Sequence, residues 1–489
     1  MSLNIGIDFG TSTLIIAKWN EQKNIPEIVP HIVPANFGVN DQLDNAVYYE
    51  EDMNLTLGRI ALKKLSVEPQ NGVREIKRYL DDDNWIKTIH GEEKTAIDIM
   101  QDVFTYIEQQ IRRIYGNETI DNVVISVPYA FEQKERKKIE QAAMQSNLPV
   151  VALIEEPVAA ALSSGLFDLL EPNRKENVLI FDLGGGTFDV TIFEAFIDDE
   201  NKKHISVLST DGDSKLGGVN VDEIIINKII ENFDSPIDFN SLTENEKNRL
   251  NFTLFDEGRT IKHDLSESDD VPVFIVLENH DIVSEFVYER TDLENALGVS
   301  MIPKIKQVLH RVLDSANLKP NQIDQIILVG GSSNIPSVSN IVNSIFKRSP
   351  KIIDDPSVLV GKGAAIYCGI LADEVDDIVI ERRTNQGYGL KQGGRIKMLL
   401  AKNEPYLTAS PYYDVIIPAS KPGGKIAVYM SENGDLHSSD KIGFIKVITG
   451  HYERNQVRIQ LYISNSGSLC YRTYNISGEL ITAGDVVEV

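Results

Sequence analysis

Two stretches of the chain combine aspartates with bare glycine backbone. Residues 178–190 read VLIFDLGGGTFDV, a buried strand pattern that runs through Asp182 into three glycines and Thr187 and then into a second strand. A weaker twin, IGIDFGTSTLIIAKW, covers residues 5–19 and carries Asp8 before a glycine–threonine turn. Glycine lets the backbone approach a ligand closely, and successive backbone N–H groups in such a turn bind anions. Two turns of this kind that face each other would clamp a polyphosphate from both sides.

The aspartates indicate a metal ion beside that phosphate. A carboxylate repels phosphate directly, so Asp8 and Asp182 suit a hydrated magnesium ion lying between them and the phosphates. The alternative is a glycine-rich hairpin with surface aspartates, which a lone GGG motif would favour. The twin motif and the later Gly330–Gly331 turn favour phosphate binding instead.

The elements that must position these turns are repeated as well. Each turn is followed by a helical stretch and then by a buried strand that ends in a turn, VVISVPYAF at 123–131 and IILVGGSSNIP at 326–336. The repetition predicts two related α/β lobes. Helices are expected over 133–146 and, after a first-turn proline, over 336–346. The alanine-rich stretch 155–166 suits close helix packing.

The pattern changes in roughly the last hundred residues, where turns and short alternating runs replace helical periods. VRIQLYIS, residues 457–464, alternates strictly, and NSGS then reads as a turn into a further strand. We therefore expect an α/β domain over 1–376, a linker over 377–384 and an all-β domain over 385–489.

Composition limits the function further. A chain of 489 residues is expected to form two or more domains, and its net charge of −25 argues against nucleic acid and anionic membrane as partners. The first strand begins almost at the N-terminus, and no apolar segment is long enough to span a bilayer. Cys368 and Cys470 form no disulfide or metal pattern, which favours the reducing cytoplasm.

The order of the motifs resembles that of the heat-shock-protein-70 (DnaK-like) chaperones. IGIDFGTST, IKRYL, VVISVPYAF, EEPVAAAL, DLGGGTFDV, DGDSKLGGVNVD and ILVGGSSNIP occur in the family's order, and DDPSVLVGKGAA, DIVIE and MLLAKNEPYL extend the resemblance over nearly the whole chain. The resemblance implies a duplicated, two-lobed ATPase domain of the actin-like (ribonuclease-H-like) fold, followed by a β-sandwich that binds peptides. It further implies ATP and ADP with Mg2+, and K+ as an additional candidate ion.

The resemblance also assigns roles to single residues. The implied catalytic residues are Lys77, which would position the terminal phosphate and the attacking water, Glu156, Asp182, Thr187 and Asp189. Asp8 and Asp182 would hold the metal. The implied nucleotide-binding residues are Gly10, Thr11, Ser12, Thr13, Gly185, Gly186, Thr187, Gly217, Gly218, Lys262, Ser266, Gly330, Gly331, Ser332 and Ser333. Among them, Lys262 and Ser266 match adenosine-contacting positions of the family. Without the resemblance to this family, Lys77 would be interpreted as an ordinary solvated lysine.

Several positions depart from the family pattern. Arg259 stands where the family has a ribose-binding glutamate, and Asn334 replaces an adenine-stacking arginine. These changes predict weaker nucleotide affinity without removing the phosphate chemistry. Ala152 replaces an arginine near which J-domain partners dock, so we expect a specialised J-domain co-chaperone, besides a nucleotide exchange factor. Gln392 replaces an apolar residue that arches over the peptide, and no helical period follows residue 475 to supply the family's lid.

Two functions follow from the sequence. The first is an ATP-dependent chaperone that binds unfolded or extended hydrophobic peptides and couples hydrolysis to peptide affinity. The alternative is a specialised regulatory or scaffold protein that uses the same ATPase switch on one dedicated partner. Fold alone does not separate them.

Overall fold

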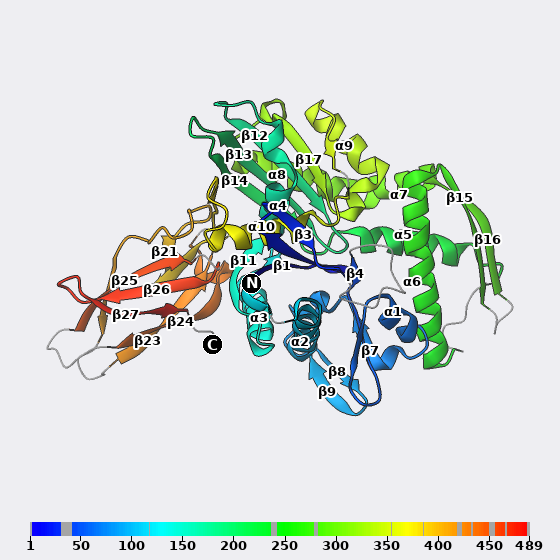
Figure 1. Ribbon diagram of the computed structural model, residues 1–489, viewed down its shortest axis with the longest axis horizontal. Helices are drawn as coiled ribbons and strands as arrows, with labels where there is room; N and C mark the ends of the chain where they lie inside the picture. The colour runs from blue at the N-terminus through cyan, green and yellow to red at the C-terminus, as the bar shows by residue number, and fades with distance from the viewer. Residues whose placement is uncertain are drawn as a thin grey trace.

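The computed structural model places two α/β lobes beside each other and an all-β domain against the first lobe (Figure 1). It describes residues 2–30, 42–116, 118–235, 242–277, 282–353, 355–384, 386–417, 423–431, 434–448, 455–464 and 467–486. The predicted combination of α/β structure with a C-terminal all-β part is confirmed.

The first sheet has six strands in the order β11, β10, β1, β2 and β3, with β4 paired to β2. β11, β10 and β1 are parallel, whereas β1, β2 and β3 alternate in direction. β-Branched runs such as VVISV on β10 favour strands that are buried on both faces. The strands are β1 Ser2–Phe9, β2 Thr13–Asn20, β3 Ile25–Ile28, β4 Leu43–Asp44, β10 Thr119–Val127 and β11 Val150–Glu155.

The second sheet repeats this arrangement with the order β18, β17, β12, β13 and β14, and adds β19 beside β14. Its first three strands are parallel and the next pairs antiparallel, as in the first sheet. Asp8 and Asp182 each stand one residue before the end of β1 and β12, so the two sheets share one topology, as the repeated motif predicts. The strands are β12 Glu176–Leu183, β13 Phe188–Ile197, β14 Lys203–Asp213, β17 Gln325–Val329, β18 Lys351–Ile352 and β19 Ile378–Glu381.

Helices α4 (Glu156–Ser163) and α10 (Leu359–Leu371) join the two sheets through one apolar cluster. Their contact is close, because a Cβ added to Gly363 would lie 1.7 Å from the carbonyl oxygen of Ala159. The alanine-rich stretch therefore packs as predicted. The helix ends at Ser163, and Gly165 then takes a left-handed φ of 66° before a short 3-10 turn.

The remaining elements surround these sheets. Helix α2 buries an apolar face in the core of the first lobe and begins at a capping box formed by Thr95 and Asp98. In the second lobe, α6 runs beside the β15–β16 hairpin (Figure 1). The elements are α1 Arg59–Leu65, α2 Ala96–Tyr115, α3 Gln133–Gln145, α5 Gly218–Glu231, α6 Glu244–Glu267, α7 Arg290–Ser300, α8 Ile302–Ser315, α9 Pro336–Phe346, β5 Ala46–Tyr49, β6 Leu55–Leu57, β7 Gly72–Arg74, β8 Ile86–Ile89, β9 Glu92–Thr95, β15 Asp270–Leu277 and β16 Ile282–Glu289.

The C-terminal part forms two four-stranded antiparallel sheets, ordered β21-β20-β23-β24 and β22-β25-β26-β27, around one apolar core. The predicted alternating strand is β25, and the predicted strand after the turn is β26. The strands are β20 Tyr388–Gln392, β21 Arg395–Leu400, β22 Tyr413–Ile417, β23 Gly423–Met430, β24 Asp440–Ile448, β25 Asn455–Ile463, β26 Leu469–Tyr474 and β27 Leu480–Asp485.

The segment before this β domain belongs to the second sheet. β19 pairs in parallel with β14, with Ile380 opposite Ile205, and Lys203 Nζ lies 2.9 Å from the Asp377 carboxylate. The β domain lies against α3 and β11 of the first lobe (Figure 1). Residues 378–381 of the predicted linker are thus a strand of the second sheet in this structure.

Candidate nucleotide site

The two glycine turns meet between the lobes. The first connects β1 to β2, and the second connects β12 to β13. A Cβ added to Gly185 would lie 2.2 Å from Ser12 Oγ, and one on Gly186 would lie 2.8 Å from Thr11 Cγ2. Only glycine fits at these positions without movement of the other turn. The predicted facing arrangement is therefore present in the geometry, with bare backbone on one side and hydroxyl groups on the other.

A second group of predicted residues lies against the Gly185 turn. The N–H of Gly218, at the start of α5, donates to the carbonyl of Gly184 at 3.0 Å. A Cβ on Gly217 would lie 2.6 Å from the carbonyl oxygen of Gly185. A Cβ on Gly218 would lie 2.4 Å from Ser332 Oγ and 3.0 Å from Lys262 Nζ. Segments from three other places in the sequence thus gather at one side of the turn.

The glycine turn after β17 lies against Asp182, the aspartate of the second motif. Gly330 has a φ of 80°, in the left-handed region, and its Cβ would lie 2.7 Å from Asp182 Oδ1. The neighbouring Gly331 is open to space, and the Ser333 hydroxyl bonds the carbonyl of Val329. On α6, the Ser266 hydroxyl donates to the carbonyl of Lys262, four residues earlier, at 2.9 Å.

Lys77 is buried in an ion pair with Glu156, at 2.6 Å between Nζ and Oε1. Lys77 lies on a 3-10 turn, Ile76–Tyr79, which follows Glu75 in a left-handed conformation with φ 54°. Glu156 is the first residue of α4, where Pro157 favours helix initiation. The Ser12 hydroxyl donates to Glu75 at 3.3 Å, so the first glycine turn is joined to the segment that carries the lysine.

A cavity of about 570 Å³ opens onto this phosphate end of the site. Its lining includes Thr11, Lys77, Gly186 and Thr187, and it also includes Lys215. The residues assigned to adenosine, Lys262 among them, lie outside this cavity. The cavity therefore opens at the predicted phosphate end of the site.

Three carboxyl groups are buried beside the lysine pair. The Ser126 hydroxyl donates to Asp8 Oδ1 at 2.6 Å, whereas Asp182 and Asp189 face each other in the β12–β13 register. Burial and then the charge of Glu156 raise the pKa of Asp8 to about 7 and that of Asp189 to about 8. Burial, followed by the three neighbouring carboxylates, also raises the pKa of Asp182 well above its usual range. The site thus holds more carboxyl groups than the single positive charge of Lys77 can neutralise.

These carboxyl groups fit a hydrated divalent cation. Asp189 Oδ1 is buried and has no hydrogen-bond partner among the described residues. No group of three or more histidine, cysteine, aspartate or glutamate side chains forms a closed metal cage within the described ranges. Magnesium keeps several waters and uses one or two carboxylates together with phosphate oxygens. The residues present can therefore hold the ion that Asp8 and Asp182 were predicted to bind.

The structure also shows partners that the sequence motifs did not identify. Asp222, in the turn of α5 after Gly217–Gly218, is buried and lies 2.7 Å from Lys262 Nζ, so the lysine predicted to contact adenosine is already paired. Arg259, on α6, lies 3.0 Å from Asp44 of the first lobe. The divergent arginine therefore forms an ion pair between the lobes. Only the LGGVNVD motif gave a sequence signal for Asp222, and nothing in the sequence indicated Asp44.

Duplicated α/β lobes with two facing glycine turns and a buried lysine–glutamate pair define a nucleotide-binding class of protein. The family model for "Hsp70 protein" matches residues 4–470, so the chain belongs to the Hsp70 family. The chaperone protein DnaK of Picrophilus torridus is 32% identical over 414 residues, which cover 82% of this chain. The chain spans 64% of the length of that relative. None of the described helices combines the length and apolar content needed to cross a membrane.

Proposed function

We propose that this protein is an ATP-dependent molecular chaperone that binds extended hydrophobic peptides and couples ATP hydrolysis to peptide affinity. The observation that carries the proposal is the meeting of the two glycine turns beside the buried Lys77–Glu156 pair. The lobe that carries the second turn continues through β19 into the β domain, which supports coupling between the two parts.

The proposed domain division follows the sequence. Residues 1–376 form an actin-like ATPase domain, 377–384 the linker and 385–489 the β-sandwich that binds peptide. The extended peptide would be held by strand-like hydrogen bonds and apolar pockets. Specific J-domain and exchange-factor partners, K+ as an additional ion and a cytoplasmic location belong to the same proposal.

The chain's own residues would act mainly by positioning charge. Thr11 and Thr187 and the glycine N–H groups would hold the phosphates, and Lys77 would orient the terminal phosphate and the attacking water. Glu156 would keep Lys77 in place through their ion pair. Asp8 and Asp182 would hold the water shell of magnesium, which, when bound, neutralises charge on the phosphates. Phosphoryl transfer to water needs such positioning and electrostatic stabilisation, without a serine or histidine nucleophile.

Equilibrium peptide binding tests this proposal against the dedicated-partner alternative, which the family match does not support. The purified chain is titrated against an array of unrelated hydrophobic peptides with Mg·ADP and with Mg·ATP. Binding of many peptides, weaker with ATP, is expected. Binding of a single peptide sequence, or affinities that do not depend on the nucleotide, would overturn the proposal.

A further inference from the structure

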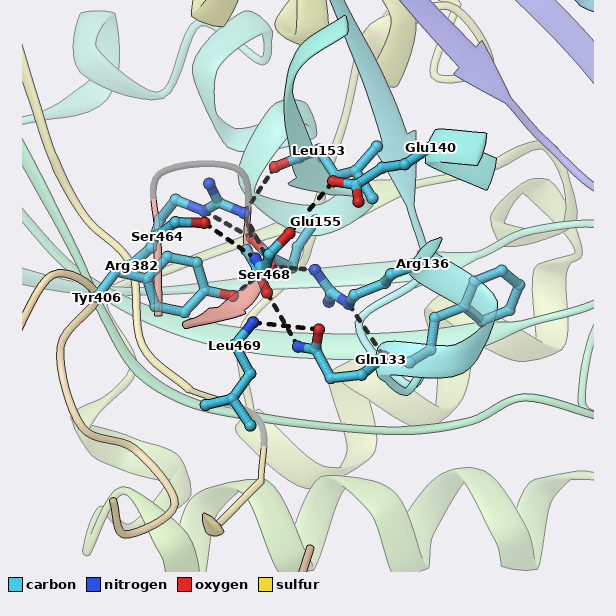
Figure 2. A network of polar contacts seen from close by, with 12 residues as sticks. Gln133, Arg136, Glu140, Leu153, Glu155, Arg382, Tyr406, Ser464, Ser468 and Leu469 are labelled. Carbon is cyan, nitrogen blue, oxygen red and sulfur yellow. Dashed lines mark hydrogen bonds and ion pairs between the residues drawn. The ribbon is translucent and has the colours of Figure 1, made fainter. Parts of the chain in front are cut away.

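The interface between the first lobe and the β domain is built around one buried carboxylate, Glu155. Glu155 is the last residue of β11 and accepts hydrogen bonds from three side chains (Figure 2). Arg136 Nη1 lies at 3.0 Å, Arg382 donates from Nε at 2.9 Å and from Nη2 at 3.0 Å, and Tyr406 Oη lies at 2.9 Å. We name these four residues the interdomain cluster. They come from the first lobe, the linker and the β domain.

Each partner in the cluster is held in place. Arg382 Nη2 also donates to the Leu153 carbonyl at 2.8 Å, and its guanidinium lies over the Tyr406 ring at 4.6 Å. Both arginines are nearly fully buried, so their charges are not screened by water. Burial acts to raise the pKa of Glu155, but Arg382 and Arg136 together lower it to about 2. The carboxylate therefore stays ionised at every ordinary pH.

The helix α3 extends this contact along one face. Gln133, Arg136, Lys137 and Glu140 recur at the spacing of one helical face. Gln133 donates to the Gly467 carbonyl at 2.9 Å, and Lys137 donates to the Val486 carbonyl at 2.6 Å. These polar contacts on backbone groups give the docked β domain one orientation, while Glu155 supplies the buried charge at its centre.

The position of Glu155 in the chain connects this interface with the nucleotide site. Its neighbour Glu156 holds Lys77 at the phosphate end. Two consecutive carboxylates therefore have different partners, since Glu155 pairs with the linker arginine and Glu156 with the lysine. A shift of the end of β11 must move both, because they share one peptide bond.

We propose that Arg382 is a positioning residue of this protein, which fixes the linker strand and the docked β domain on Glu155 and thereby sets the geometry of the Lys77–Glu156 pair. The proposed effect on hydrolysis rests on the proposed ATPase function, whereas the docking effect does not. Arg382→Gln removes the two-point contact but leaves Glu155 paired with Arg136, so the first lobe keeps a compensated carboxylate. Arg382→Lys keeps the charge without the two-point geometry.

An arginine within the β domain supplies a control. Arg458 of β25 pairs with Asp414 of β22 at 3.4 Å, so this contact lies within one sheet of the β domain. Hydrogen exchange of the β19 amides reports docking without any need for catalysis. We expect at least tenfold faster exchange over β19 in Arg382→Gln, a smaller increase in Arg382→Lys and no change in Arg458→Gln.

Single-turnover ATP hydrolysis is measured on the same variants. A changed rate in Arg382→Gln and an unchanged rate in Arg458→Gln would support the coupling. Exchange over β19 that is equal in all variants would overturn the role of Arg382 in docking, even if the chain hydrolyses ATP. Faster exchange with an unaltered hydrolysis rate would overturn the coupling alone. A wild-type chain without hydrolysis would instead refute the proposed function, and the exchange result would still decide the docking role.

Discussion

Replacement of Lys77 by methionine should separate catalysis from folding. The side chains of Lys77 and Glu156 are only 3% and 11% exposed, so Lys77→Met leaves an uncompensated buried carboxylate. Loss of one partner of a buried pair costs about 3–5 kcal/mol of stability. Lys77 also lowers the pKa values of Asp8 and Asp189, so its removal weakens the metal site as well. Loss of one preorganised cationic donor reduces the rate about 10²- to 10³-fold.

A second substitution distinguishes the two effects. Lys77→Met combined with Glu156→Gln removes both charges, so the free energy of unfolding should recover most of its loss. Hydrolysis should not recover, because the double variant lacks the lysine that would orient the terminal phosphate and the attacking water. Lys138→Met is the control, since Lys138 is a partly buried lysine of the same lobe that pairs with Asp83. Stability is followed by chemical denaturation, and hydrolysis by single-turnover assays with saturating Mg·ATP.

The double variant can also contradict the proposed role of Lys77. Hydrolysis within about threefold of the wild-type rate in the double variant, with ATP bound, would remove Lys77 from the mechanism. An unfolded double variant would show that the pair does more for the fold than its charges explain. The Lys138→Met variant must hydrolyse ATP at the wild-type rate for the comparison to stand.

Two further perturbations follow from the same site. Because the pKa of Asp189 is raised to about 8 in the folded protein, the stability that its bound proton confers is complete below about pH 4 and is lost as the pH rises toward 8. Without nucleotide or magnesium, Asp189→Asn should therefore melt about 2 °C or more above wild type at pH 8, and the difference should shrink toward pH 5. A difference in melting temperature that is the same at both pH values would contradict this. The Arg259–Asp44 ion pair is partly exposed and should contribute at most about 1 kcal/mol, so Arg259→Ala should release a fluorescent ADP analogue no more than about fivefold faster. Asp44→Asn should give the same increase, and additive effects in the double variant would show that the two residues act separately.

Local sequence signals predicted the parts of the fold that depend on short spacings. The glycine turns, the aspartates near the ends of β1 and β12 and the first-turn proline of α9 all act within a few residues of chain. The resemblance located Lys77, because the type of residue alone does not distinguish a buried lysine from a solvated one. The end of α4 could not be read from the sequence, since the left-handed conformation of Gly165 is visible there only as a glycine.

Contacts that join distant segments could not be predicted in this way. Arg382 and Glu155 are 227 positions apart, and they meet only because β19 pairs with β14 and the β domain docks on α3. A charged residue after a linker strand reads as a surface residue, since burial of an arginine depends on a partner that the local pattern does not contain. Lys262 shows the same limit, because its partner Asp222 lies on another helix.

The rate at which a bound peptide leaves the β domain tests the central claim most directly. A fluorescent hydrophobic peptide is bound in the presence of Mg·ADP, and its release is followed by stopped-flow fluorescence after mixing with excess unlabelled peptide and either Mg·ADP or Mg·ATP. Affinity changes at such sites lie mainly in the dissociation rate. ATP-coupled peptide binding predicts faster release with Mg·ATP than with Mg·ADP. Equal release rates with the two nucleotides, in a chain shown to bind both, would contradict it.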